Sequence, residues 1–178
     1  MPTPPRPDRI VRPATPGDAA AIVAIYDHYV AHSIITFEEQ PVPVDEMVRR
    51  LAEVAAASLP WLVAEERGRV VGYAYASRWK TRSAYRHSVE TTVYLAPDAV
   101  GHGIGSALYA RLFPLLGARG VHAAVAGIAL PNDASVALHE RCGMRKVAHF
   151  PEVGFKFGRW IDVGYWQRTF GDDGGTRT

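Results

Sequence analysis

The stretch VETTVYLAPDAVGHGIGS, residues 89–106, decides the fold of this chain. In its first half, β-branched and apolar residues at 89, 91, 93 and 95 alternate with Glu90, Thr92 and Tyr94. A period of two over such residues predicts a β-strand with two distinct faces. Pro97 then ends the strand, because proline lacks the N–H that a sheet ladder needs.

A glycine-rich turn follows this strand and leads into a helix. Its glycines are Gly101, Gly103 and Gly105, and the apolar residues Ile104, Leu108 and Leu112 then recur at helical spacing. Glycine lets the backbone adopt left-handed conformations, and the first N–H groups of a helix have no intrahelical partner. Together with the positive end of the helix dipole, these donors predict a site for an anionic phosphate.

The glycine spacing decides between kinds of phosphate site. A P-loop needs a Gly-Lys-Ser/Thr ending, which this turn lacks, and a dinucleotide fingerprint needs G-x-G-x-x-G where this chain has G-x-G-x-G. The turn instead resembles the pyrophosphate loop of the GNAT acyltransferases, Gln/Arg-x-x-Gly-x-Gly/Ala. Two positions depart from that pattern: Val100 replaces the Gln/Arg, and His102 stands where arginine is common.

Composition is that of an ordinary globular protein. The chain has 178 residues, 48% hydrophobic and 21% charged, with a formal net charge of +2. Its arginines are scattered, which argues against nucleic-acid binding, and its single cysteine, Cys142, excludes an internal disulfide and a multi-cysteine metal site. No apolar run long enough for a membrane span is present, and we expect a cytoplasmic protein without a bound metal.

Periodicity along the chain predicts one domain over residues 10–170, between a flexible arm at 1–9 and a flexible tail at 171–178. The expected order is β, α, α, three strands, α, β, α, β, β, which is an α+β fold with a mixed, largely antiparallel sheet flanked by helices. The helix at 44–57 should face inward with Met47, Leu51, Val54 and Ala55. We expect the helix after the glycine turn to kink or end at Pro114.

Six segments in this order resemble the phosphinothricin N-acetyltransferase family, a branch of the GNAT superfamily. They are PWLVAE at 60–65, WKTRSAY at 79–85, ETTVY at 90–94, LPND at 130–133 with His139-Glu140, GFK at 154–156 and DVGYWQ at 162–167. The similarity covers roughly residues 10–170. It implies a GNAT fold and acetyl transfer from acetyl-CoA to the amino group of a small amino acid or analogue, such as phosphinothricin or methionine sulfoximine or sulfone.

The resemblance makes Glu90 the candidate general base. An acceptor amine arrives as ammonium and must lose a proton before it attacks the thioester directly, and a neighbouring carboxylate can take that proton. Partial burial would raise the pKa of Glu90 toward the working pH. Without the family, an exposed glutamate on the polar face of a strand is the ordinary interpretation.

His139 and Asn132 lie in family segments further along. His139 stands where many GNAT enzymes carry a tyrosine near the acyl-CoA sulfur, and it would protonate the leaving thiolate or hold the thioester. A packing or surface role is the alternative for a lone helical histidine. Asn132 is expected to begin a helix and also to bind the cofactor arm.

The resemblance assigns the acceptor site to Lys80, Arg82 and Tyr85, with Phe37 as a substrate-side aromatic. A cationic pair with a phenol suits a carboxylate or phosphinate, because arginine offers a bidentate fork. The alternatives are a solvated basic loop and, for Phe37, a core or lid role.

The cofactor site is expected along the strand and the glycine turn. The edge of Val93-Tyr94-Leu95 would pair with the pantetheine arm and polarise the thioester carbonyl, at a point where the strands splay. Amides of the turn would hold the pyrophosphate; the residues concerned are Gly101, His102, Gly103, Ile104, Gly105 and Ser106.

Two other functions remain open at this stage. One is a GNAT enzyme for another small amine or a peptide N-terminus, and the other is a non-catalytic acyl-CoA-binding module. The resemblance also implies a homodimer, for which the apolar strand at Val163 to Trp166 is a candidate surface.

Overall fold

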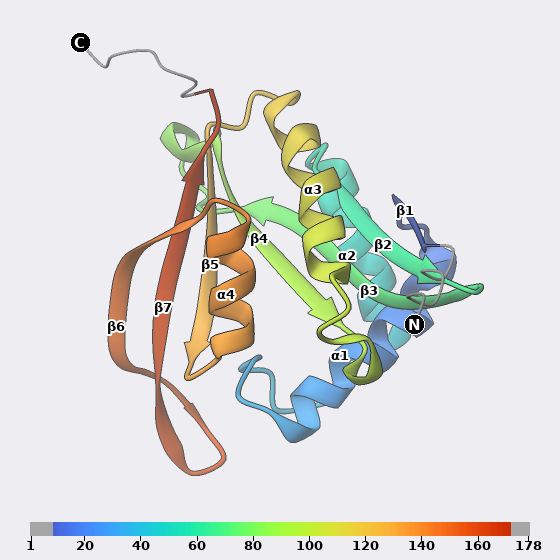
Figure 1. Ribbon diagram of the computed structural model, residues 1–178, viewed down its shortest axis with the longest axis horizontal. Helices are drawn as coiled ribbons and strands as arrows, with labels where there is room; N and C mark the ends of the chain where they lie inside the picture. The colour runs from blue at the N-terminus through green and yellow to red at the C-terminus, as the bar shows by residue number, and fades with distance from the viewer. Residues whose placement is uncertain (1–8, 172–178) are drawn as a thin grey trace, which may run out of the picture.

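The computed structural model describes residues 9–171, which form a seven-stranded sheet with helices on both faces (Figure 1). The strand order is β1-β2-β3-β4-β5-β7-β6. All neighbouring strands are antiparallel except β4 and β5, which are parallel. This is the mixed, largely antiparallel α+β architecture that the sequence predicts, in the predicted order.

The bounds of the elements are close to those expected. The strands are β1 (Arg9–Pro13), β2 (Trp61–Glu66), β3 (Arg69–Arg78), β4 (Ser88–Leu95), β5 (Ala123–Leu130), β6 (Arg145–Lys156) and β7 (Arg159–Thr169). The α-helices are α1 (Ala19–His32), α2 (Val44–Ala56), α3 (Ile104–Gly117) and α4 (Asp133–Arg141). Single 3₁₀ turns lie at Pro16–Asp18, Ser83–Tyr85 and Pro97–Ala99.

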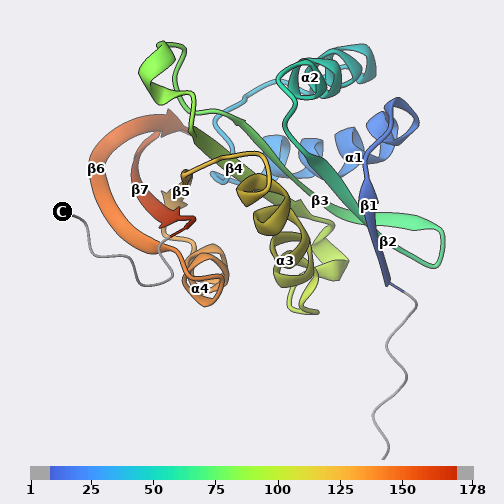
Figure 2. The ribbon, with the colours of Figure 1, turned by 90° about the horizontal axis from the view of Figure 1, so that it is seen from above.

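The helices form two layers, with α1 and α2 on one face of the sheet and α3 and α4 on the other (Figure 2). Helix α3 buries one stripe completely: Ile104, Leu108, Leu112 and Leu116. Their spacing of four residues keeps them on one side of the helix. The stripe packs against β2, β3 and β4, so the core fixes the orientation of α3 and of the glycine turn before it.

The structure corrects three expectations about these elements: an end of α3 at Pro114, the inward position of Ala55, and a free apolar surface at Val163 to Trp166. Helix α3 does not end at Pro114 but continues to Gly117, because Leu112, Phe113 and Leu116 are buried and their packing outweighs the lost backbone hydrogen bond. Ala55 is exposed rather than inward.

The strand at Val163 to Trp166 does not offer a free apolar surface. It lies between β5 and β6, and Val163 and Trp166 are buried in the chain's own sheet.

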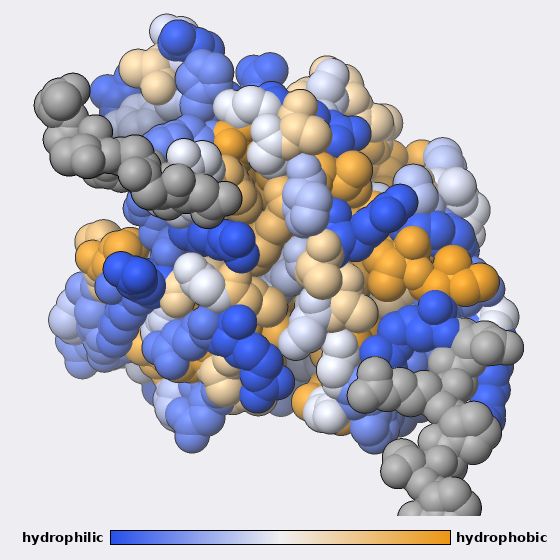
Figure 3. All heavy atoms as spheres, turned by 45° about the horizontal axis from the view of Figure 1, so that its top comes forward, coloured by the Kyte–Doolittle hydropathy of each residue, from blue (hydrophilic) through white to orange (hydrophobic). Residues whose placement is uncertain are grey.

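Polar side chains cover most of the face drawn in Figure 3, and apolar residues gather between them in narrow areas. Within residues 9–171, no helix is long and apolar enough to cross a membrane. The expected arm and tail lie outside the described residues, apart from Arg9, which belongs to β1, and Gly171.

Candidate active site

The site begins where β4 and β5 separate. These parallel strands pair only at Ser88–Glu90 with Ala123–Val125, and beyond Glu90 they diverge (Figure 1). Ala96 donates its N–H to the carbonyl oxygen of Val71 of β3. Because successive residues of an antiparallel strand direct their backbone groups to opposite edges, those of Val93 and Leu95 point away from β3, toward the gap between β4 and β5. The splay therefore exposes an unpaired strand edge that can accept an amide-rich ligand.

Tyr29 of α1 marks one end of this edge. Its hydroxyl donates to the carbonyl oxygen of Leu95 at 2.6 Å. That bond satisfies the Leu95 carbonyl within the protein and fixes the end of β4 against α1. The sequence shows Tyr29 only as one more apolar residue at helical spacing, so it gave no signal for a role in the site.

The glycine turn has the geometry that an anion site needs. Gly101 and Gly103 have φ of +85° and +76°, which an L-residue adopts only with strain. Gly103 is the N-cap of α3, so the first amides of the helix have no intrahelical acceptor and point outward from its positive end. Gly105 lies against α4, where an added Cβ would come within 2.7 Å of Leu138 Cδ2.

A cleft of about 380 Å³ runs from the glycine turn along β4 to the start of α4. It is lined by Tyr29, Ile35, Val93, Tyr94, Leu95, Val100, Gly101, Gly103, Ile104, Gly105, Ser106, Asn132, Ala134, Ser135, Ala137, Leu138 and Arg141. We call it the cofactor cleft, after the cofactor site expected from the sequence. It contains every residue of the expected cofactor site except His102, which is exposed, and whose carbonyl accepts from Arg9 at 3.1 Å.

A second cleft, of about 220 Å³, opens beside the first and is lined by Glu90. We call it the acceptor cleft, after the role expected of Glu90. The two clefts share a boundary formed by Ile35, Val93, Tyr94, Asn132 and Ser135. The two clefts therefore adjoin along these five residues.

Glu90 lies on the last residue pair before the strands diverge, and its side chain is half-buried in the acceptor cleft. Burial raises the pKa of Glu90, and the positive charge of Lys80 partly opposes that rise. Gly127 of β5 faces it, with a Cβ position 3.6 Å from Glu90 Oε1. The carboxylate thus has room on the β5 side and a pKa shifted in the direction that a base needs.

His139 lines the acceptor cleft but is 3% exposed and has partners at both ring nitrogens. Nδ1 lies 2.7 Å from the carbonyl oxygen of Ser135, which can only accept, so Nδ1 carries the hydrogen. Nε2 lies 2.9 Å from the Tyr109 hydroxyl and accepts from it. Burial lowers the pKa of His139, so the ring is neutral at pH 7.

Asn132 lies at the boundary of the clefts and begins α4. Its Oδ1 accepts the N–H of Ser135 at 3.1 Å, which is the capping role expected from the sequence. The side chain of Ser135 lines both clefts, and the N-x-x-S spacing of the cap is the signal by which it could have been found.

The expected acceptor residues divide into two groups. Lys80 is exposed, with Nζ 4.7 Å from the centre of the Trp79 ring, and its charge acts on Glu90. Arg82 and Tyr85 are exposed on the β3–β4 loop, 5.8 Å apart from guanidinium carbon to ring centre, and neither lines the two clefts.

Phe37 lines the acceptor cleft from the segment that joins α1 to α2. Its ring occupies the place of a side chain on Gly154 of β6, where an added Cβ would lie 2.3 Å from the ring. The structure thus places Phe37 and Glu90 in one cleft.

Comparison with known proteins agrees with this geometry. A family model described as an acetyltransferase (GNAT) domain matches residues 11–164. A phosphinothricin N-acetyltransferase of Streptomyces viridochromogenes is 44% identical over 160 residues, 90% of this chain and 87% of that protein. An L-methionine sulfoximine/L-methionine sulfone acetyltransferase of Salmonella typhimurium is 40% identical over 160 residues, 88% of this chain and 92% of that protein.

Solved structures give the same fold. The structure of a GNAT superfamily phosphinothricin acetyltransferase from Sinorhizobium meliloti, in complex with acetyl-CoA, superposes with a TM-score of 0.89. The two sequences are 38% identical, and the match covers 95% of this chain and 92% of that one.

Proposed function

The chain belongs to the GNAT acetyltransferase family, and we propose that it acetylates the amino group of a small amino acid or analogue with Glu90 as general base. Acetyl-CoA supplies the acetyl group as a thioester. The observation that carries the proposal is the half-buried Glu90 in an acceptor cleft that shares a boundary with the cofactor cleft.

Two features of the cofactor cleft suit acetyl-CoA. The outward amides at Ile104 to Ser106 and the positive helix end suit a pyrophosphate. The unpaired edge at Val93 and Leu95 suits the amides of pantetheine. Val100 offers no polar side chain, so binding at the turn relies on backbone donors.

In the acceptor cleft, Glu90 takes the proton that the acceptor ammonium must lose, directly or through one water. The free amine then attacks the thioester carbonyl, the nitrogen–carbon bond forms, and the carbon–sulfur bond breaks. Coenzyme A leaves as the thiolate, and the second proton that the nitrogen loses balances the charge of that thiolate. The N–H groups at the free edge of β4 supply a donor for the developing negative charge on the carbonyl oxygen.

We propose that His139 positions the start of α4 rather than donating a proton. Its Nδ1–H is committed to the Ser135 carbonyl, its Nε2 accepts from Tyr109, and burial lowers its pKa. With its one N–H bound to a carbonyl and its other nitrogen occupied as an acceptor, the neutral ring has no free N–H to offer the leaving thiolate. Ser135, which it holds, lies at the boundary of the two clefts.

The relatives' names support a small amino acid analogue as acceptor. The positive charge of Lys80 lowers the pKa of Glu90. We therefore propose that Lys80 faces the acceptor's carboxylate. Arg82 and Tyr85 remain proposed acceptor residues, because an exposed loop is expected to be mobile enough to bring them to the acceptor. The competing acceptors are another small amine and a peptide N-terminus.

Acceptor comparison tests the carboxylate requirement. Methionine sulfone should be acetylated with a kcat/KM at least about tenfold higher than its carboxamide, because a single charge-assisted hydrogen bond contributes about 1.5–3 kcal/mol. Thiol release from acetyl-CoA measures both rates. Equal values for the acid and the amide would exclude Lys80 as a carboxylate partner.

The variant Lys80→Met should move the acid limb of the pH–rate profile to higher pH. The positive charge of Lys80 lowers the pKa of Glu90, so its removal raises that pKa further above the ordinary glutamate value. A base works only when deprotonated, so activity should then appear at higher pH. The profile of kcat/KM measures this, and Lys146→Met, at an exposed lysine of β6, is the control. An unmoved limb in Lys80→Met would contradict the account.

A homodimer and a cytoplasmic location are part of the proposal. Apolar side chains on β6 and at the start of β7 are exposed, among them Val153 of β6 at 59% and Trp160 of β7 at 62%, and a second copy would cover them. A cytoplasmic location is compatible with the single cysteine, because a chain with one cysteine forms no internal disulfide and so needs no oxidising compartment. Light scattering should give a dimer for the wild type and a monomer for a Val153→Lys, Trp160→Lys variant. A wild-type monomer across micromolar concentrations would exclude the dimer.

A further inference from the structure

Lys156 is a buried lysine that neither the proposed chemistry nor the cofactor cleft uses. It is the last residue of β6, and it is 1% exposed. Burying an ammonium is unfavourable unless its N–H groups find acceptors. Nζ donates to the carbonyl oxygen of Val30 at 2.8 Å and to that of Thr36 at 2.9 Å, and it lies 5.0 Å from the centre of the Phe157 ring.

The two acceptors belong to different parts of the chain. Val30 lies in the last turn of α1, where carbonyl groups have no intrahelical donor and the helix dipole is negative. Thr36 lies in the segment of residues 33–43 between α1 and α2. The ammonium therefore joins the end of α1, the beginning of that segment and strand β6 at one point. Burial lowers the pKa of Lys156, and the negative charges of Glu39 and Glu38 in the same segment partly oppose that shift.

The segment that Lys156 holds is a wall of the proposed site. Ile35, Thr36 and Phe37 line the acceptor cleft, and Ile35 also lines the cofactor cleft. Gly154, two residues before Lys156, is buried on the same face of β6 and receives the ring of Phe37. One strand face thus fixes both the backbone and the aromatic side chain of this wall.

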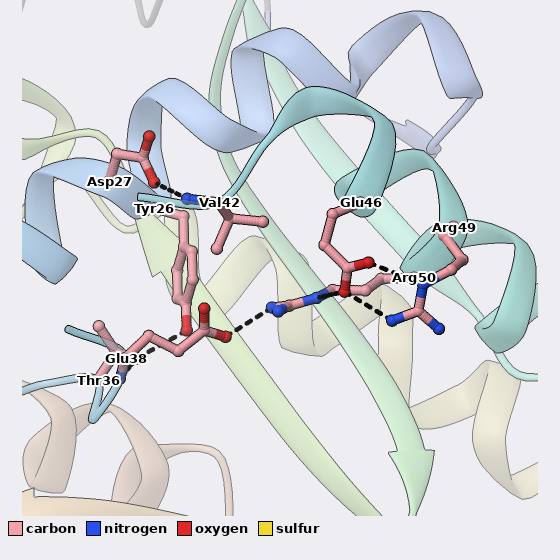
Figure 4. Close-up of polar contacts among 8 residues, drawn as sticks. All are labelled: Tyr26, Asp27, Thr36, Glu38, Val42, Glu46, Arg49 and Arg50. Atoms are coloured by element: carbon pink, nitrogen blue, oxygen red, sulfur yellow. Dashed lines mark hydrogen bonds and ion pairs between the residues drawn. The ribbon is translucent and has the colours of Figure 1, made fainter. Parts of the chain in front are cut away.

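The other contacts of the segment come from α1 and α2 (Figure 4). Tyr26 and Thr36 are joined through their hydroxyls at 2.7 Å, and Arg50 donates to Glu38 at 2.7 Å. Asp27 accepts the N–H of Val42 at 3.0 Å. These bonds hold the side chain of Thr36 and the rest of the segment, whereas Lys156 binds the backbone next to Phe37.

We propose that Lys156 is a positioning residue for the acceptor: it sets the backbone of residues 35–37 and so the shape of the acceptor cleft. The proposal rests on the acceptor site proposed above. Lys156 acts through Phe37 and Ile35 and is not one of the residues that line either cleft. Its loss should therefore affect binding of the acceptor far more than binding of acetyl-CoA.

The test is the variant Lys156→Met, which keeps the length and apolar stem of the side chain and removes the donors. We expect the acceptor KM to rise about tenfold or more, since small misplacements of positioning groups cost up to about 10²-fold. The KM for acetyl-CoA should change less than about twofold, and Lys146→Met, on the exposed part of the same strand, should change neither. Thermal unfolding shows whether each variant is folded.

The outcomes separate this inference from the proposed function. Wild-type enzyme that acetylates no amino acid analogue would overturn the proposed function and this inference with it. Active wild type with an unchanged acceptor KM in Lys156→Met, or with both KM values raised equally, would overturn the positioning role alone. If Lys156→Met does not fold, Lys156→Arg decides, because it keeps the cation but moves the donors. A raised acceptor KM at constant acetyl-CoA KM supports the role, and two unchanged values overturn it.

Discussion

Glu90→Gln should lower kcat about 10²- to 10⁴-fold, the usual contribution of a positioned general base. Glutamine has nearly the same shape as glutamate but cannot take a proton from the acceptor ammonium. Because Glu90 lines the acceptor cleft and not the cofactor cleft, the affinity for acetyl-CoA should stay unchanged. Thiol release at saturating substrates measures kcat, and calorimetry measures acetyl-CoA binding.

The pH dependence of kcat/KM provides a second test of Glu90→Gln. In the wild type, the acid limb of kcat/KM should lie above the ordinary pKa of a glutamate, because burial raises the pKa of Glu90. In Glu90→Gln that limb should be absent. Glu53→Gln, on the exposed face of α2, is the matched control and should behave as wild type. Full turnover in a folded Glu90→Gln enzyme would remove Glu90 as the base.

Leu112→Ala should lower the free energy of unfolding by about 2–5 kcal/mol, the range for a large-to-small change in a well-packed core. Leu112 is fully buried in the middle of the apolar stripe of α3, and the same stripe orients the glycine turn. Urea denaturation measures the loss, read as a lower midpoint at an unchanged slope.

Leu115→Ala is the control on the same helix. Leu115 is half-buried, so the same chemical change should cost clearly less there. If both variants lost the same free energy, the packing of α3 described above would be wrong, and with it the reason why the glycine turn is rigid.

Local features of the site could be predicted because they are encoded in contiguous residues. The alternation before Leu95, the proline stop and the glycines at 101, 103 and 105 all act within a few residues. The same is true of the Asn132 cap, which needs only the N–H of Ser135. For such features, the residue types determine the backbone geometry without help from the rest of the fold.

Features that need distant partners could not be predicted in this way. His139 Nε2 finds its hydrogen-bond partner in Tyr109, 30 residues away, and the burial of Lys156 depends on carbonyl groups of Val30 and Thr36, more than 100 residues away. The continuation of α3 past Pro114 likewise depends on tertiary packing that outweighs a local preference.

The acceptor loop shows the same limit. The sequence groups Lys80, Arg82 and Tyr85 as neighbours. All three are exposed and line neither cleft, and of the three only Lys80 has a charge that affects the pKa of Glu90. Closeness in sequence does not determine which side chains of a loop reach a cleft.

Thiol release from acetyl-CoA across a panel of amines tests the central claim most directly. The panel comprises phosphinothricin, methionine sulfoximine, methionine sulfone, common amino acids, polyamines and short peptides. The account predicts rapid release with the first three, and mass spectrometry should find the acetyl group on their amino nitrogen. Release only with polyamines or peptides, at the same enzyme concentration, would contradict the proposed acceptor class.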